Sequence, residues 1–263
     1  MKKRGSGTAL GFKLQLVTSW ERRRPAGSHS CGGLVNLPAR RRRSHGLQSD
    51  LEFRQFAQQI GVTMANDSPV NHLRLFIAIP IPEPVRDEII RVQQELQPLV
   101  PRNVARWTRP DQFHLTLRFL GDVPADGVED LKKSAGAVCR IVRPLSLRAE
   151  GVGFFPNPRS PRVIWVGIND REGRLVGLQQ QIEIAVGQFS PEPGEKNFTG
   201  HVTLGRLKNP RPADIRDLAA WAQSLEKRLF GEWTAHEIEI IRSELSPAGA
   251  RYTSLAAFRL GAV

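Results

Sequence analysis

Cysteine is scarce in this sequence, which has two among its 263 residues, Cys31 and Cys139. They form no paired-cysteine motif, so the sequence predicts neither a disulfide framework nor a thiolate metal cage. Long apolar runs are also missing, since none approaches the roughly 18 residues that a membrane-spanning helix needs, and no secretory signal is recognisable. We therefore expect a cytoplasmic protein with no membrane segment. Its 40% hydrophobic content is enough to build a core for one large or two small domains.

Acidic residues are scarce at the front of the chain, where the positive charge is concentrated. Residues 1–67 hold 12 Lys/Arg and 4 Asp/Glu, which leaves 26 of the 38 Lys/Arg and 22 of the 26 Asp/Glu for residues 68–263. The first segment has many Gly and Ser and no sustained hydrophobic periodicity, a composition typical of a segment that does not fold. We therefore expect a basic, disordered leader or upstream extension over residues 1–67 and a folded domain over residues 68–263.

Three interpretations of this leader stay open. It is a basic arm that binds nucleic acid, an Arg-rich targeting peptide, or upstream sequence before a start at Met64. The targeting peptide is favoured by residues 1–49, which contain one acid, Glu21. We prefer a start at Met64, because only a few polar residues separate it from the regular pattern that begins at Leu73.

From Leu73 onward the hydrophobic pattern switches between strand and helix periods. It predicts strands over 73–79, 113–120, 145–150, 162–168, 201–207, 236–243 and 251–260, and helices over 84–97, 126–142, 173–189 and 212–228. Phe76 lies 38 residues before His114, and Trp165 lies 36 residues before His201. Each half of the domain therefore reads strand, helix, histidine strand, helix, and we expect two similar lobes.

The same short motif stands in both histidine strands, as His114-Leu115-Thr116-Leu117 and His201-Val202-Thr203-Leu204. Residues i and i+2 of a strand share a face, so each histidine should stand beside its threonine while the apolar residues point into the core. If the lobes pair about a pseudo-twofold axis, the two faces meet across a cleft. The cleft then holds two imidazoles and two hydroxyl groups.

This set of groups suits phosphoryl transfer. One histidine can take a proton from the attacking water while the other gives a proton to the departing oxygen, because a pKa near 6.5 lets both forms coexist. Thr116 and Thr203 can donate hydrogen bonds to the phosphate oxygens, and Arg206 is the expected source of a planar positive group. The sequence has no cluster with metal-ligand spacing, so we expect no metal and no cofactor.

Chance explains the paired motif poorly. Two histidines that are each followed by apolar, Thr and apolar residues arise on the order of once in a thousand chains with six histidines. The other four histidines do not repeat the pattern, and we expect them to be structural: His29, His45, His72 and His236.

The motifs resemble those of the 2H phosphoesterases, most closely the RNA 2',3'-cyclic phosphodiesterases once described as 2'-5' RNA ligases. The resemblance covers about residues 73–260. It is carried by Arg74-Leu75-Phe76-Ile77-Ala78-Ile79, Trp107, Phe113-His114-Leu115-Thr116-Leu117-Arg118-Phe119-Leu120-Gly121, Val163-Ile164-Trp165-Val166-Gly167 and His201-Val202-Thr203-Leu204-Gly205-Arg206.

The resemblance implies a bilobal α+β fold, in which two pseudo-symmetric lobes line a central cleft with antiparallel sheets and carry their helices outside. It also implies hydrolysis of RNA 2',3'-cyclic phosphate ends to 2'-phosphomonoesters by His114 as the acid and His201 as the base. Thr116, Thr203 and Arg206 would then hold the phosphate.

The resemblance further suggests RNA contacts at Phe76, Arg118 and Phe119. The expected partner is an RNA end, and the small excess charge of residues 68–263 favours few phosphate contacts. We expect a monomer. The alternatives are 2'-5' RNA ligation, action on small cyclic nucleotides, and RNA-end binding without catalysis.

Overall fold

The computed structural model describes residues 71–261 except Lys196 and Ala248. The prediction for the leader, residues 1–67, lies outside the described residues. The described part contains four α-helices, α2 (Glu83–Leu96), α3 (Val128–Ile141), α4 (Arg174–Val186) and α5 (Pro212–Ser224). Its strands are β1 (His72–Pro80), β2 (Ala105–Trp107), β3 (His114–Pro124), β4 (Leu145–Phe155), β5 (Val163–Asn169), β6 (His201–Leu207), β7 (Leu229–Ala235), β8 (Glu237–Ser246) and β9 (Gly249–Arg259).

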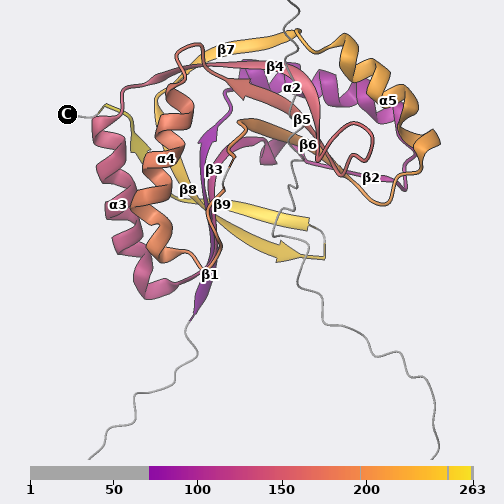
Figure 1. Cartoon of the computed structure of the whole chain (residues 1–263). Coiled ribbons are helices and arrows are strands. Elements are labelled where there is room, and N and C mark those ends of the chain that lie inside the picture. Colours follow the sequence, from indigo (N-terminus) through magenta and orange to yellow (C-terminus); the bar gives the residue numbers. More distant parts are fainter. Residues whose placement is uncertain (1–70, 196, 248, 262–263) are drawn as a thin grey trace, which may run out of the picture. The chain divides into compact units, whose positions relative to one another are not determined.

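The strands form two antiparallel sheets (Figure 1). The first, sheet A, has the order β3-β1-β8-β9, and the second, sheet B, has the order β2-β6-β5-β4-β7. Each sheet therefore contains one of the two histidine strands, β3 in sheet A and β6 in sheet B. The expected α+β fold with two antiparallel lobes is confirmed.

The lobes exchange elements between the two halves of the sequence. Sheet A takes its last two strands, β8 and β9, from the end of the chain, while β4 of the first half joins sheet B. The helices cross in the same way, because α4 contacts β3 of sheet A and α2 contacts β7 of sheet B. In Figure 1, α3 and α4 stand together beside sheet A, and α2 and α5 lie beside sheet B. Neither lobe can therefore be cut out of the chain as one continuous segment.

One hydrophobic core connects the helices with the faces of the sheets that they cover. The buried residues of α2 and α3 fall at helical spacing, with Val85, Ile89, Val92 and Leu96 on α2 and Leu131, Ala135 and Val138 on α3. The strands contribute alternate residues to the same core. Cys139 also belongs to it, and burial raises the pKa of this thiol to about 12, so it is a small core residue. The opposite faces of the sheets carry the histidines, and we call them the histidine faces.

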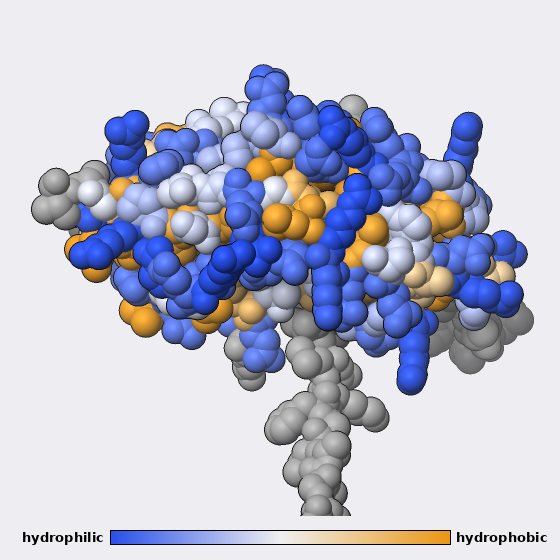
Figure 2. Space-filling model, turned by 90° about the horizontal axis from the view of Figure 1, so that it is seen from above, coloured by the Kyte–Doolittle hydropathy of each residue, from blue (hydrophilic) through white to orange (hydrophobic). Residues whose placement is uncertain are grey.

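The outer surface is mixed in character. Figure 2 looks down on the side of β4, β7 and α2, where hydrophilic residues cover most of the surface and hydrophobic residues gather in a band between them.

The sequence pattern missed two strands and overextended one helix. β2 has only three residues, and β7 lies at an edge of sheet B with its side chains alternately exposed and covered. The last helix was predicted to reach residue 228, but α5 ends at Ser224 and the turn that leads into β7 begins there. The two strands were missed because their local pattern is weak and edge strands are stabilised by pairing with residues that are distant in the sequence.

Candidate active site

Each histidine strand contains a β-bulge at the third residue after its histidine. In β3, Thr116 pairs with Ala78 and Arg118 with Ile77, so Leu117 has no partner. In β6, Thr203 pairs with Trp165 and Gly205 with Ile164, so Leu204 has no partner. The two lobes therefore repeat both the motif and the irregularity that follows it.

The bulge changes which residues lie on the histidine face. Strict alternation from His114 would place Arg118 on this face and Phe119 on the other. The extra residue reverses the order, so that Phe119 is 44% exposed beside Phe76, whereas Arg118 is 4% exposed. In β6 the same shift puts Gly205 on the buried side and leaves Arg206 exposed.

The suggested RNA contact of Arg118 is not supported by this placement. Its guanidinium donates to the carbonyl oxygens of Glu192 and Pro193 and to Ser190 Oγ, and its Nε lies 3.0 Å from Glu183 Oε2. Arg118 thus lies in the protein interior and stabilises the segment 190–193, which precedes β6.

Both histidines are oriented by the same local hydrogen bond. His114 Nδ1 lies 2.6 Å from the carbonyl oxygen of Gln112, and His201 Nδ1 lies 2.8 Å from that of Thr199. A carbonyl oxygen only accepts, so each Nδ1 carries a proton and donates it. Nε2 is then the nitrogen of each ring that can take up or release a proton.

Aromatic rings surround each imidazole. The His114 ring lies 4.7 Å from Phe76 and 5.4 Å from Tyr252 between ring centroids. The His201 ring lies 5.0 Å from Phe155 and 6.2 Å from Trp165. Each imidazole is therefore surrounded by weakly polar aromatic rings, and its charged form is poorly solvated.

This environment lowers the pKa of both histidines. The pKa of His114 is lowered to about 4, chiefly by burial and to a smaller extent by the nearby His201, while the hydrogen bond to Gln112 opposes the shift. Burial also lowers the pKa of His201, with a smaller contribution from Arg206 in the same direction. The charge of His201 thus acts on the proton of His114, and β3 and β6 are in contact. The neutral forms of both imidazoles are therefore favoured near pH 7.

The remaining residues that the sequence singled out fall on the same two faces. Thr116 and Thr203 are half-buried, each two residues beyond its histidine, and Arg206 is exposed near the end of β6. Phe76 is also on the histidine face, but it is 1% exposed because the rings of His114, Phe119 and Tyr252 lie against it. Phe76 therefore forms a floor beneath His114, and Phe119 offers the accessible ring.

Sequence reasoning did not assign a role to Tyr252 or Trp165, two of the aromatic residues beside the histidines. Tyr252 is the only tyrosine of the chain, but its place beside His114 results from the exchange of β9 into sheet A. Trp165 lies flat over Gly153, where a Cβ would come within 2.2 Å of the indole. Gly153 opposite Trp165 was the sequence signal for this contact, but it could be recognised only once the pairing of β4 with β5 was known.

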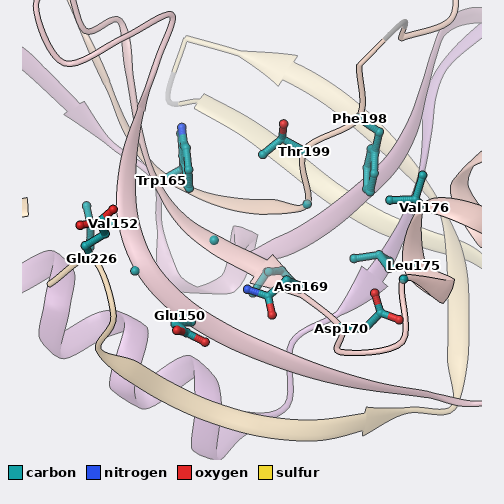
Figure 3. A pocket seen from close by; sticks show the side chains of 15 residues that line it. Glu150, Val152, Trp165, Asn169, Asp170, Leu175, Val176, Phe198, Thr199 and Glu226 are labelled. Atoms are coloured by element: carbon teal, nitrogen blue, oxygen red, sulfur yellow. The ribbon is translucent and has the colours of Figure 1, made fainter. Parts of the chain in front are cut away.

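A pocket of about 580 Å³ opens next to His201. Trp165 and Thr199 line it on one side, and Glu150, Asn169 and Asp170 line it on another (Figure 3). Thr199 is the residue whose carbonyl oxygen orients His201. The pocket thus continues the histidine face of sheet B away from Arg206.

No group of His, Cys, Asp and Glu side chains suited to a metal ion occurs in the described part of the chain. Among these same residues, no helix has the length and apolar character needed to cross a membrane.

Comparisons with known proteins agree with these features. The model of the family described as LigT-like phosphoesterases matches residues 79–165. The RNA 2',3'-cyclic phosphodiesterase of Methanothermobacter thermautotrophicus is 32% identical over 189 residues, which are 72% of this chain and 99% of that protein. The protein of the same name from Thermus thermophilus is 35% identical over 196 residues, 72% of this chain and 90% of that protein.

Solved structures show the same relationship. A crystal structure from Thermus thermophilus matches with a TM-score of 0.60 and 32% identity, covering 72% of this chain and 98% of that chain. The structure of E. coli LigT complexed with 3'-AMP has a TM-score of 0.56 and 25% identity, with coverage of 72% and 98%. The chain therefore belongs to the LigT-like, or 2H, phosphoesterases and is an enzyme of this family, as its motifs predicted.

Proposed function

We propose that this enzyme hydrolyses 2',3'-cyclic phosphate ends of RNA to 2'-phosphomonoesters, with His114 and His201 as its acid and base. The proposal rests chiefly on one observation. Each lobe delivers a histidine whose Nδ1 is bound to a backbone carbonyl oxygen, so that Nε2 is left for proton transfer beside a threonine hydroxyl. The names of the relatives, RNA 2',3'-cyclic phosphodiesterase, support the choice of substrate.

The proposed reaction is an in-line displacement at phosphorus. His201 Nε2 takes a proton from water as the water oxygen forms its bond to phosphorus. The bond from phosphorus to O3' breaks, and His114 Nε2 gives its proton to O3'. The product carries a 2'-phosphate and a free 3'-hydroxyl group, and one proton has moved from one imidazole to the other.

The phosphate would be held by neutral and positive donors. The hydroxyl groups of Thr116 and Thr203 donate hydrogen bonds to the non-bridging phosphate oxygens, and the guanidinium of Arg206 donates to the same phosphate. Phe119, which is 44% exposed, can stack on the terminal base, an interaction worth about 1–3 kcal/mol. Phe76 supports that ring from below.

Substrate binding must raise the pKa of His114 if this residue is the acid. A pKa of about 4 leaves the imidazole mostly neutral near pH 7. The cyclic phosphate is an anion, so placing it against the ring favours the protonated form and restores an acid that can serve the leaving oxygen.

The activity is tested with a short oligoribonucleotide that carries a 2',3'-cyclic end. Phosphorus NMR against authentic standards identifies the product, and we expect the 2'-phosphate. His114→Ala and His201→Ala should each lower kcat/KM by at least about 10²-fold with the fold retained, and the double variant should lose far less than the product of the two factors. Near-normal turnover by either single variant would sink the mechanism.

The acid and base roles can be separated with a better leaving group. A substrate whose leaving group needs no proton should rescue His114→Ala more than His201→Ala. The opposite preference would exchange the two roles.

The alternative reactions are outcomes of the same assay. Ligation would appear as a 2'-5' linked product when RNA with a free 5'-hydroxyl end is added, and preference for a cyclic mononucleotide would indicate a small-molecule substrate. A cytoplasmic location and a monomeric state stay predictions from the sequence.

A further inference from the structure

Four arginines from different parts of the chain gather around Tyr252. Arg106 of β2 stands directly opposite Arg206 of β6, and it reaches across to β9, where its Nη2 would lie 3.2 Å from a Cβ at Gly249. Arg109 Nη2 lies 3.4 Å from the carbonyl oxygen of Ala250. Arg106 and Arg109 thus reach β9 from β2 and from the loop that follows β2.

Arg74 completes the group from β1. It lies two residues before Phe76 on the same strand, and the Phe76 ring is 5.0 Å from that of Tyr252. Burial raises the pKa of Tyr252, while Arg206, Arg74, Arg106 and Arg109 all lower it. All four positive charges therefore act on one phenol group, which itself lies 5.4 Å from the ring of His114. We call Arg74, Arg106, Arg109 and Arg206 the arginine cluster.

Within the described part of the chain, two carboxylates lie beside Arg74 and Arg109: Asp122 stands opposite Arg74 on β3, and Asp111 is next to Arg109. Asp111 forms a two-pronged ion pair with Arg109. In the described part of the chain, neither Arg74 nor Arg106 has an ion pair with a carboxylate. A second pocket, of about 420 Å³, lies beside the cluster and is lined by Arg109, Arg251 and Tyr252 among others. There is thus a hollow next to the His114 side of the site, and its charged lining consists of Arg109, Arg251 and Asp111.

The opposite end of β6 has the opposite charge. His201 is the first residue of the strand and Arg206 is the sixth. Glu150 pairs with Gly167, which pairs with His201, so this carboxylate lies on the histidine face at the His201 end. Asp170 and Glu226 line the same pocket as Glu150. A phosphate that leaves the site in this direction would meet these three carboxyl groups, of which Glu150 forms an ion pair of 3.4 Å with Arg148.

We propose that three members of the arginine cluster, Arg74, Arg106 and Arg109, bind the phosphates of the nucleotides that precede the cyclic end, so that the RNA strand leaves the site between β2 and β9 and not past Glu150. This inference rests on the proposed function, because it takes the cyclic phosphate to lie between His114 and His201. Charges of opposite sign on the two sides give the strand a single favourable direction. Arginine suits the task because its planar group binds phosphate oxygens in pairs.

The test compares two substrates of different length. A five-nucleotide RNA with a 2',3'-cyclic end has upstream phosphates, and a 2',3'-cyclic mononucleotide has none. The variant replaces Arg74, Arg106 and Arg109 by Gln and keeps Arg206, which belongs to the proposed phosphate site. We expect kcat/KM for the five-nucleotide RNA to fall at least about 10-fold, since each lost contact weakens an electrostatic attraction. Turnover of the mononucleotide should stay within about twofold of the original enzyme.

Salt dependence provides a second readout. Each phosphate contact on a single strand contributes about −0.7 to the slope of log affinity against log salt. The variant should therefore have a slope that is shallower by about 1 to 2. Replacement of the three arginines by Lys should retain most of that slope, because lysine keeps the charge.

A matched control removes the same charge elsewhere. Arg140, Arg143 and Arg216 are exposed, on or directly after the outer helices α3 and α5, and their replacement by Gln should leave both substrates unaffected. Equal losses in the control and the test variant would overturn the inference, as would a loss on the mononucleotide as large as that on the RNA. Thermal unfolding of each variant shows whether the fold is retained, and the single variants Arg74→Gln, Arg106→Gln and Arg109→Gln decide the case if the triple Gln variant does not fold.

Binding separates this inference from the proposed reaction. Fluorescence anisotropy measures the affinity for a labelled five-nucleotide RNA with a 2'-phosphate end, which needs no turnover. If the original enzyme hydrolyses neither cyclic substrate but binds this RNA through the arginine cluster, the proposed function fails and the inference stands. If the Gln variant binds this RNA as tightly as the original enzyme, the inference fails whatever the activity.

Discussion

Replacement of Arg118 by Met tests whether this residue is a structural support or an RNA contact. The Arg118 side chain is 4% exposed and makes hydrogen bonds of 2.9, 2.6 and 3.2 Å to Pro193, Glu192 and Ser190. It also forms an ion pair of 3.0 Å with Glu183, which is 25% exposed. Its removal leaves the carboxylate of Glu183 and the carbonyl oxygens of Glu192 and Pro193 without this donor.

The expected loss is large compared with total stability. Breaking a buried ion pair by removing one partner costs about 3–5 kcal/mol, and the partial exposure of Glu183 favours the lower end, about 3 kcal/mol. A domain has a free energy of unfolding of about 5–15 kcal/mol. Urea denaturation should therefore show a clearly lower midpoint for Arg118→Met.

Two further variants make the result specific. Arg91→Met removes an exposed ion pair with Glu88, and it should cost less than about 1 kcal/mol. Arg118→Met combined with Glu183→Leu should be less destabilised than the two single changes added together, because no carboxylate is left without its partner. A loss below about 1 kcal/mol in Arg118→Met, with weaker binding of RNA, would refute the structural role and restore Arg118 as an RNA contact.

Four other predictions concern pH, metals and the leader. Because burial lowers the pKa of both histidines, to about 4 for His114, kcat/KM should reach its maximum below pH 6.5 and fall on either side, while a profile flat from about pH 5 to 9 would exclude histidine catalysis. The stability that comes from a neutral buried His114 should be present above pH 6.5 and lost as the pH falls towards 4, visible as a lower Tm in acid. A chelator should leave turnover unchanged, and loss of activity that a divalent ion restores would contradict the two-histidine mechanism. A chain that starts at Met64 should fold and turn over a short RNA as the full chain does, and failure to fold, seen by circular dichroism, would refute the predicted boundary.

The sequence by itself determined most of the helices and strands, but not β2 and β7, and it determined the paired motif. Hydrophobic spacing is a local property, so the period of two in β1 and β6 and the period of 3.6 in α2 and α3 could be read directly. The repeated histidine and threonine pointed to two similar lobes and to the chemistry proposed for them, because residues two apart on a strand share a face.

Only the tertiary structure decided which other groups stand beside that motif. The bulges after Thr116 and Thr203 depend on pairing with β1 and β5, and they reverse the sides taken by Arg118 and Phe119. The exchange of β8 and β9 into sheet A brings Tyr252 to His114 across more than half of the domain sequence. The arginine cluster has the same origin, since its members come from β1, β2, β6 and the loop after β2 and meet only when both sheets are assembled. Strand register and the exchange of elements are set by contacts between distant residues, and local periodicity carries no information about them.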